Sequence, residues 1–589
     1  MKYYLTLLLC LLCYFLMAQK QITFSLAKVP VSAGQRVGIR GNTAPLSWEK
    51  SLILQSNNDL FSIALSFTNA QKLIEYKYVL EDASGKIIWE LDGQMNRLIL
   101  PEEATAKDQW NVSNDLKIRN LPKITSTALL KDFEILQEAI LTIHPGLYRY
   151  NTEESIAQHL AELRNTLQED LTYTEAYLAF SKLAGAIRCG HTYANFFNQN
   201  TLIQHLILNQ KDKLPFAFNI INKRVFITKN ATDIELLNPG TEITAINDIP
   251  VAQILDSLLT VVKADGGNDA KRLDDLQLNG YNYFESFDVY FPLFFPPVEG
   301  IYKIKGVSTA DNQLFTKNVN AIDRKTRTER LAARYDMPTS LEDLWKFEII
   351  NNDIGYLKLG TFVTWNFTMD WRKFLKESFT TLKKQKIPHL VIDIRGNEGG
   401  LDEVIEALGN YVLQQDCQVE NFQDKVRYKT VPATLKSHIT TWDTSVYDLS
   451  KKIIPAEAGY YTFKDDPPLT RFRASSNAYK GKIYLLVNAA NSSATFYLSR
   501  LAKSCGLATL VGQETGGSLQ GINGGTILFL RLPNSQIEID IPIFGGFART
   551  PQPAHGIRPD LEVLPNIEDL RNGKDTELEF IKNWIYSQK

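Results

Sequence analysis

A serine placed between a buried strand and a helix is the feature that most constrains this chain. Residues 483–487 form an apolar, β-rich run, residues 488–492 form a small polar turn, and residues 494–503 repeat apolar side chains at helical spacing. This order puts the Ser493 hydroxyl at the positive N-terminal end of a helix, where backbone N–H groups stabilise negative charge. A serine in such a turn is also a common helix cap, so the spacing to other motifs must decide its role.

A glycine-rich turn earlier in the chain repeats the order of strand, turn and helix. Residues 390–394 read as a buried strand, residues 395–400 read RGNEGG, and a helix is predicted from Asp402. Glycines in this turn let the backbone approach a substrate carbonyl closely. An oxyanion formed at Ser493 would then lie between the N–H of Ala494 and the N–H of either Gly399 or Gly400.

These segments resemble the serine peptidases of the C-terminal-processing (tail-specific) and tricorn family. Residues 393–400, DIRGNEGG, match the family's first block, and residues 491–495, NSSAT, match the turn that carries its nucleophile. A third block follows at the usual distance, GQETGG over residues 512–517. The resemblance implies a crotonase-like core of βαβ units, shared with the Clp proteases, and a serine-type endopeptidase or carboxyl-terminal processing peptidase with Ser493 as nucleophile.

The general base separates the two branches of this family. Processing peptidases carry a lysine directly after the third block, where this chain has Ser518. Tricorn-like members use a histidine from an upstream helical region, in a Gly-His-Thr or Gly-His-Ser turn, and residues 188–192 read RCGHT. The resemblance therefore implies that His191 is the base. We expect activity to rise through roughly pH 6 to 7.5 as its imidazole loses a proton.

The third catalytic member is left open by the sequence. Tricorn-like enzymes place a glutamate three residues before a late Gly-x-x-Pro-Asp block, and that position is Pro553 here. Glu514 is a substitute candidate and His555 is a nearby alternative. If neither serves, the backbone alone holds His191.

Length and composition indicate a multidomain globular protein. The chain has 589 residues, 44% hydrophobic and 22% charged, with a formal net charge of −2, so no basic excess points to nucleic acid. Residues 1–18 read as a secretory signal peptide, too short to span a membrane. We therefore expect export across the inner membrane to the periplasm or the exterior.

Cysteine and histidine spacing indicates neither a disulfide framework nor a metal site. Removal of the signal would leave Cys189, Cys417 and Cys505, which allow at most one bridge. The seven histidines are scattered and none has zinc-ligand spacing. We expect no cofactor and no metal.

Residues 21–105 are predicted to form a β-sandwich, because strand-like runs alternate with turns. This segment resembles the starch-binding modules of glucoamylases, on the residues VGIRGN (37–42), LSWE (46–49), EYKY (75–78), WE (89–90) and NR (96–97). Such modules stack two tryptophans on sugar rings, and Trp48 and Trp89 match them. The alternative is that both side chains belong to the core of a module that no longer binds sugar.

Three further regions complete the predicted multidomain α/β organisation. Residues 123–205 are largely helical and carry His191, and residues 210–310 form a mixed domain similar to the PDZ module, which binds peptide ends by strand addition. Residues 345–570 form the peptidase core, in which residues 526–532 and 536–543 make a hairpin at the end of the sheet.

The combined prediction is a secreted serine peptidase that uses Ser493 and His191 to form an acyl-enzyme on a peptide or protein substrate. Two alternatives stay open. A degenerate peptidase fold would bind glycan or peptide without catalysis, and a hydrolase of other acyl groups would use the same constellation.

Overall fold

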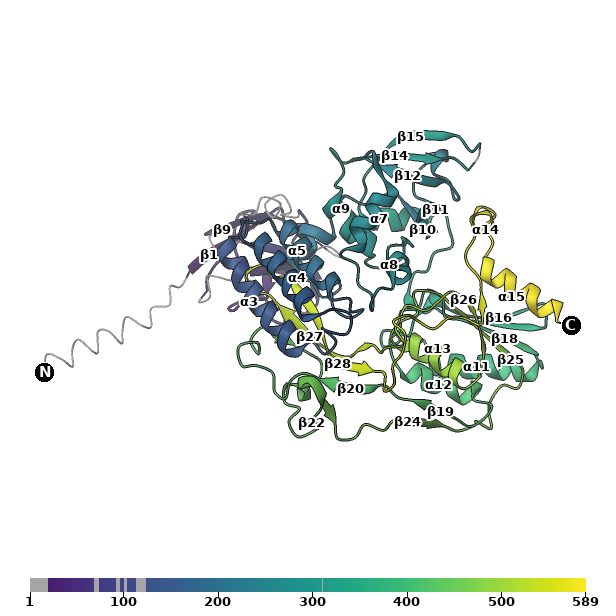
Figure 1. Cartoon of the computed structure of the whole chain (residues 1–589). Helices are drawn as coiled ribbons and strands as arrows, with labels where there is room; N and C mark the ends of the chain where they lie inside the picture. Colours follow the sequence, from purple (N-terminus) through teal and green to yellow (C-terminus); the bar gives the residue numbers. More distant parts are fainter. Residues whose placement is uncertain are drawn as a thin grey trace. The chain divides into compact units, whose positions relative to one another are not determined.

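The computed structural model describes residues 20–67, 74–91, 96–99, 103–112, 123–309 and 311–588 (Figure 1). Two compact units divide the chain: the first comprises residues up to Pro122 together with Asn200–Leu206, and the second comprises Lys123–Gln199 and Ile207–Lys589. The predicted signal peptide, residues 1–18, lies outside the described residues. A multidomain α/β organisation with several sheets is confirmed.

The first unit contains two packed sheets. One has the order β4-β5-β1-β9 and the other β3-β2-β6-β7, with β8 also paired to β6. Their bounds are β1 (Lys20–Ala27), β2 (Arg36–Gly41), β3 (Leu52–Ile53), β4 (Gln55–Asn57), β5 (Leu60–Phe67), β6 (Ile74–Glu81), β7 (Ile87–Trp89), β8 (Arg97–Ile99) and β9 (Thr105–Gln109). Buried side chains alternate along β1, because successive residues face opposite sides of a strand.

A buried ion network lies inside this unit. Arg97 donates to both carboxylate oxygens of Glu90 at 2.7 Å and to Asp108 at 3.2 Å. The hydroxyls of Tyr76 and Tyr78 also donate to Asp108. The charges are therefore paired and hydrogen-bonded, as buried charges must be.

The second unit begins with three capped helices, α3 (Ser126–Ile143), α4 (Glu153–Thr166) and α5 (Tyr173–Ala186). Threonine side chains cap each N-terminus, because they accept a hydrogen bond from an N–H group of the first turn. The turn that carries His191 follows α5 directly.

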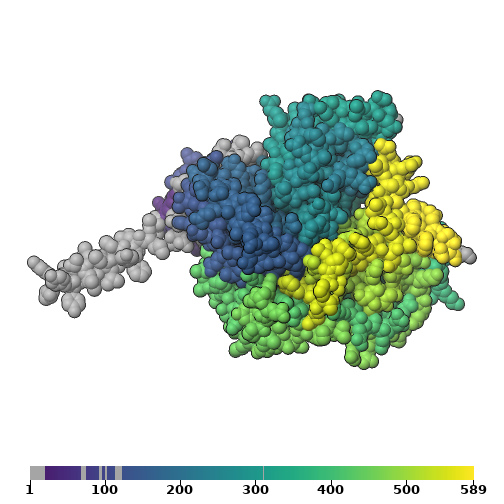
Figure 2. All heavy atoms as spheres, in the orientation of Figure 1, coloured from purple at the N-terminus to yellow at the C-terminus, as the bar shows by residue number. Residues whose placement is uncertain are grey.

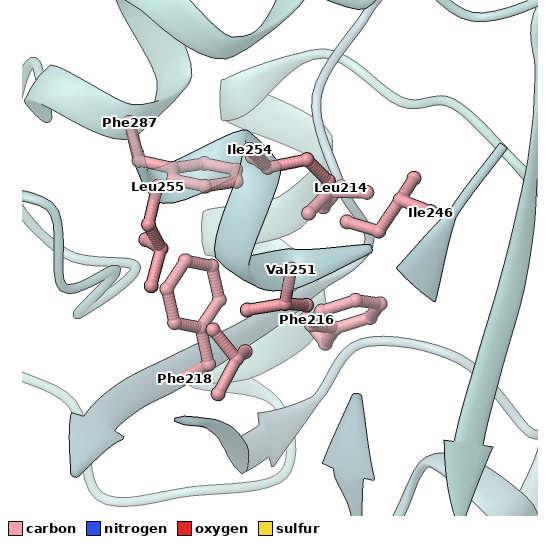
Figure 3. Close-up of a pocket in the computed structure, with 9 residues that line it drawn as sticks. Leu214, Phe216, Phe218, Ile246, Val251, Ile254, Leu255 and Phe287 are labelled. Carbon is pink, nitrogen blue, oxygen red and sulfur yellow. The ribbon is translucent and has the colours of Figure 1, made fainter. Parts of the chain in front are cut away.

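A mixed domain follows, with the sheet order β10-β11-β12-β14-β15 and β13 paired to β12. The bounds are β10 (Phe216–Ile221), β11 (Arg224–Asn230), β12 (Glu242–Ile246), β13 (Ile249–Pro250), β14 (Ile301–Val307), β15 (Leu314–Asn320), α7 (Val251–Leu259), α8 (Asp269–Asp275), α9 (Ser286–Phe294) and α10 (Arg324–Ala332). Apolar side chains from β10 and α7 point toward one another, with Phe287 of α9 beside them (Figure 3). The remaining cavity is about 10 Å³, which is no more than a water-sized space.

The core sheet has the order β16-β17-β18-β25-β26-β29. All neighbours are parallel except the antiparallel pair of β16 and β17. The bounds are β16 (Trp345–Ile350), β17 (Ile354–Leu359), β18 (His389–Asp393), β25 (Lys482–Val487), β26 (Thr509–Gly512), β29 (Leu561–Glu562), α11 (Trp371–Lys384), α12 (Glu403–Val412), α13 (Ala494–Ser504) and α15 (Thr576–Ser587). One face of the sheet packs on α11, α12 and α13, and the other packs on α15 (Figure 1).

The predicted hairpin does not extend this parallel sheet, which corrects the sequence-based expectation. Strands β27 (Asn523–Arg531) and β28 (Glu538–Phe547) pair within a separate sheet of order β21-β27-β28-β20-β23-β22. The other strands are β20 (Gln423–Val426), β21 (Ile439–Thr440), β22 (Ile453–Pro455) and β23 (Tyr461–Phe463). The hairpin turn is held instead by Asp132 of α3, which accepts from the N–H groups of Asn534 and Ser535.

A disulfide links two elements of the core, and a hydrogen bond links the C-terminal segment to the mixed domain. A disulfide joins Cys417 of β19 (Cys417–Glu420) to Cys505 at the end of α13. Strand β19 also pairs with β24 (Leu469–Phe472). Cys189 is a buried free thiol. Helix α14 (Ile567–Arg571) reaches the mixed domain, where Arg571 donates to the Gly240 carbonyl. Figure 2 shows this yellow C-terminal segment beside the teal mixed domain.

Candidate active site

Ser493 lies where the predicted strand, turn and helix put it, after β25 and at the N-cap position directly before α13. Its backbone has φ 51° and ψ −128°, a region that costs a residue with a Cβ about 1–3 kcal/mol. The hydroxyl makes no capping hydrogen bond to the helix. The simple helix-cap role is therefore excluded. Within the described residues the hydroxyl has no hydrogen-bond partner, and its turn is strained, a geometry that strand-to-helix nucleophile turns also have.

The glycine-rich turn after β18 lies against Ser493. A Cβ added at Gly399 would lie 2.9 Å from the Ser493 Cβ and 3.0 Å from the Ala494 nitrogen. Gly399 has φ 114° and Gly400 has φ 137°, values that residues with a side chain rarely adopt. A Cβ at Gly400 would approach the Phe362 carbonyl to 2.2 Å. Glycine is therefore required at both positions, by conformation and by space.

Asparagine and threonine side chains join the two turns. Asn491 donates through Nδ2 to the carbonyls of Ile394 (2.5 Å) and Asn397 (3.0 Å). The Thr495 hydroxyl donates to the same Asn397 carbonyl at 2.9 Å. Sequence reasoning had placed these residues within the motifs but had given them no role. Their place in the sequence beside Ser493 could have indicated that they join the two turns.

The backbone amides expected to hold an oxyanion differ in their availability. The Gly399 N–H donates to Asn397 Oδ1 at 2.9 Å, so it is engaged within its own turn. The N–H groups of Gly400 and Ala494 donate to no group in the described part of the chain. Of the three predicted amides, Gly400 and Ala494 are thus the pair left free.

The turn with His191 is fixed by polar contacts on both sides of the histidine. The Gly190 N–H donates to Asp265 Oδ1 at 3.1 Å, and the Thr192 hydroxyl is 2.9 Å from His144 Nε2. The imidazole packs against β27, because a Cβ at Gly524 would come within 3.8 Å of its Cε1 and Nε2 atoms. His144, at the end of α3, anchors this turn.

Burial, together with the ammonium of Lys263, lowers the pKa of His191 from 6.5 to about 4. Glu398 opposes this shift and Lys271 adds to it. The neutral imidazole therefore predominates at pH 7, as a general base requires. This shift moves the titration below the range of roughly pH 6 to 7.5 expected for an unperturbed histidine. The structure records no hydrogen bond between His191 and Ser493.

Neither candidate for a third member contacts His191. Glu514 accepts from the Gly556 N–H at 2.9 Å and lies 3.5 Å from the Arg558 guanidinium. His555 Nδ1 lies 2.7 Å from the Gly556 carbonyl oxygen. The buried Nδ1 atom of His191 has no hydrogen-bond partner in the described residues. The expectation that Glu514 orients the base is thus not supported, because its carboxylate is used by the 556–558 segment.

A lysine does enter this neighbourhood, but from an unexpected element. Lys271 of α8 forms ion pairs with Asp275 (2.5 Å) and Glu398 (3.1 Å). The position that carries the lysine in the processing branch is occupied here by Ser518, which is buried. Burial opposes the charge on Lys271, but the two carboxylates raise its pKa above the ordinary value. Lys271 therefore stays protonated and cannot serve as the base. No sequence pattern had indicated it.

The two predicted sugar-binding tryptophans lie side by side in the first unit. The rings of Trp48 and Trp89 have centroids 6.3 Å apart at an interplanar angle of 50°, and both side chains are partly exposed. Arg40 lies over the Trp89 ring and donates to the Trp48 carbonyl at 2.8 Å. Partial exposure distinguishes them from core aromatics such as Phe24 and Phe67.

In the described residues, no group of three or more histidine, cysteine, aspartate or glutamate side chains is arranged to hold a metal ion. Over the same described ranges, no helix has both the length and the apolar character needed to span a membrane.

Comparison with known proteins gives two family matches. Residues 353–563 match the model of Peptidase family S41, and residues 19–110 match the model of the Starch binding domain. Both resemblances read from the sequence motifs are thereby confirmed. A search of curated proteins found no match.

Two solved structures share the fold over most of the chain. The structure of mature CPAF complexed with lactacystin is 14% identical, with 78% of this chain and 97% of that chain covered at a TM-score of 0.53. The crystal structure of mature CPAF is 14% identical, with 78% and 96% covered at a TM-score of 0.51. At this level of identity the likeness concerns the fold alone.

Proposed function

We propose that this chain hydrolyses peptide bonds through an acyl-enzyme formed on Ser493, because residues 353–563 match the model of Peptidase family S41. The observation that carries this proposal is the strained, uncapped Ser493 packed against the Gly399 turn. A structural serine at a helix start would instead relax and cap the helix.

In the first half of the reaction, Ser493 Oγ bonds to the scissile carbonyl carbon while its proton passes to His191. The carbonyl oxygen becomes an oxyanion, which the free N–H groups of Ala494 and Gly400 stabilise. His191 then gives the proton to the leaving amine as the C–N bond breaks. In the second half, His191 takes a proton from the water that attacks the ester carbonyl carbon. It then returns this proton to Ser493 Oγ as the C–O bond to the serine breaks and the new carboxylic acid leaves.

His191 suits this role because its site holds it neutral. Burial and the nearby lysines lower its pKa to about 4, so the imidazole is already neutral at pH 7 and can accept a proton. With Ser518 in place of the family's lysine and Lys271 held as a cation, the histidine is the base that this site offers, as in the tricorn-like branch.

We propose a crotonase-like spiral for the core and a PDZ-like fold for residues 210–310. The parallel strands β17, β18, β25 and β26, with α11, α12 and α13 between them, support the first. The antiparallel sheet with α7 against it supports the second. Side chains close its apolar centre, so peptide binding there would require strand addition at an edge and not entry into the cavity.

We also propose that the first unit binds glucan at Trp48 and Trp89. Two adjacent, partly exposed indole rings offer apolar faces of the kind that stack on the C–H-rich face of a pyranose. Arg40 lies over the Trp89 ring and donates to the Trp48 backbone carbonyl, and these two contacts hold the paired residues together before a ligand arrives. This gives the peptidase a means of concentrating on starch-like surfaces.

Export across the inner membrane is part of the proposal. The Cys417–Cys505 disulfide supports it, because such bonds persist in oxidising compartments and are rare in the cytosol.

Probe labelling and peptide digestion together test this function. The protein without residues 1–18 and its Ser493→Ala variant are treated with a fluorophosphonate probe and then with a peptide library that has free or amidated carboxyl ends. We expect labelling and cleavage by the first protein alone. Equal cleavage by the variant would refute the role of Ser493, and labelling without any peptide cleavage would favour a hydrolase of other acyl groups. Preference for free carboxyl ends would separate carboxyl-terminal processing from endopeptidase action.

A further inference from the structure

One short helix of the mixed domain touches the loops that form the candidate active site. Asn268, which caps α8, donates to the Thr515 carbonyl at 3.1 Å. Asp274 of the same helix accepts from Asn488 Nδ2 at 3.2 Å, in the turn that precedes Ser493. The mixed domain therefore contributes directly to the surroundings of the nucleophile.

Lys271 of α8 makes the third of these contacts. Its side chain is only 5% exposed, and its Nζ bonds to buried Asp275 at 2.5 Å and to Glu398 at 3.1 Å. Its methylene chain packs on Gly516 of the third sequence block, where an added Cβ would lie 2.8 Å from the Lys271 Cδ. Burying an ammonium is costly, and here two carboxylates offset that cost.

The position of Glu398 gives this ion pair a consequence for catalysis. Glu398 directly precedes Gly399 and Gly400 in the glycine turn. Its side chain is 52% exposed, its carboxylate reaches Lys271 at 3.1 Å, and its negative charge acts on His191, whose pKa it raises. A like charge at short range disfavours the developing oxyanion. We infer that Lys271 is a positioning residue of this peptidase: its ion pair with Glu398 fixes the glycine turn and neutralises a carboxylate that would oppose the reaction.

The inference rests on the proposed Ser493–His191 function, and the pH profile can distinguish it from a purely structural role. The charged groups that face His191 are Lys263 after α7, Lys271 on α8 and Glu398 on the glycine turn. The two lysines lower the pKa of His191 and Glu398 raises it. β27 packs on the ring through Gly524, a residue without a charged side chain.

The test measures fluorophosphonate labelling of Ser493 and peptide hydrolysis in Lys271→Met, Glu398→Gln and the double variant. Lys303→Met is the matched control, because Lys303 pairs with Asp248 on the exposed surface of the same domain. We expect Lys271→Met to lower kcat by about tenfold to a hundredfold with little change in KM, since an oxyanion-site contact acts in the transition state.

The acid limb of kcat/KM should move in opposite directions in the single variants. It should rise to higher pH in Lys271→Met, fall to lower pH in Glu398→Gln, and return toward the wild-type position in the double variant. The double variant should also recover most of the rate, because residue 398 then carries no charge. Burial already raises the pKa of Asp275 to about 7, so the loss of Lys271 leaves that carboxyl protonated and uncharged. Lys303→Met should match the wild type in rate and profile.

Three other outcomes would overturn the inference, and a fourth would refute the proposed function. Wild-type rate and profile in Lys271→Met would overturn the inference, as would a rate loss that the double variant does not recover. If Lys271→Met does not fold, Glu398→Gln decides, and an acid limb that stays in place overturns the inference. Absence of Ser493-dependent labelling in the wild type would instead refute the proposed function itself.

Discussion

Gly399 stands so close to Ser493 that a methyl group on residue 399 would lie 2.9 Å from the Ser493 Cβ. Gly399→Ala should therefore displace the nucleophile or the Ala494 amide and lower kcat by about 10²–10³, the range for loss of an oxyanion contact. Gly396→Ala is the matched control, because it lies in the same turn with φ 77° and has nothing within 4 Å of an added Cβ. Equal kcat values in the two variants would contradict the proposed packing.

The backbone strain at Ser493 makes a prediction about stability. φ 51° with ψ −128° is accessible to glycine but costly for any residue with a Cβ. Both Ser493→Ala and Ser493→Gly should be inactive. Relief of the strain stabilises the glycine variant, and the entropy that glycine adds to the unfolded chain opposes this effect. We expect a net free energy of unfolding about 1 kcal/mol higher for the glycine variant than for the alanine variant. Urea unfolding of both variants measures the difference. A less stable glycine variant would show that this turn is not strained.

The lowered pKa of His191 sets the pH dependence. Burial, Lys263 and Lys271 bring it from 6.5 to about 4, so kcat/KM should be lost as the pH falls through about 4 and should be nearly flat from pH 5.5 to 7.5. Because the folded pKa is below the unfolded value, the folded state binds fewer protons between these values. His191 therefore costs stability as the pH falls from 6.5 to 4.

Rates of probe labelling between pH 3.5 and 8 check this dependence, with His191→Ala as the comparison. An acid limb between pH 6 and 7.5 would show that the imidazole is solvated in the working enzyme. A His191→Ala variant with normal turnover would place the base elsewhere.

The paired tryptophans predict a separable glucan function. Trp48→Ala with Trp89→Ala should abolish retention on insoluble starch while leaving the rate of peptide hydrolysis unchanged, because the pair lies in the first unit and the catalytic residues lie in the second. Trp442→Ala is the control, since Trp442 is 62% exposed in the second unit. Equal retention of all three proteins, or retention of none, would contradict the proposed site.

The parts of the site that follow a strand were predictable from the sequence. Ser493 and Gly399 each come after an apolar run, and parallel strands end at a common edge, so their proximity followed from the pattern. The hairpin over β27 and β28 was misplaced, because local pattern identifies two antiparallel strands without showing which sheet they join. Lys271 could not be predicted, because it lies in another domain and depends on tertiary contact with Glu398.

Arg395, in the middle of the glycine-rich block, contributes to more than that turn. It pairs with Asp393 at the end of β18 and also with Asp575 and Glu577 at the start of α15. The last helix of the chain is thereby fastened to the strand end that leads into the catalytic turn. An enzyme shortened before residue 575 would leave this guanidinium without two of its three carboxylates. The far end of the chain, about eighty residues after Ser493, thus helps to hold the strand end beside the nucleophile, and its removal should lower activity.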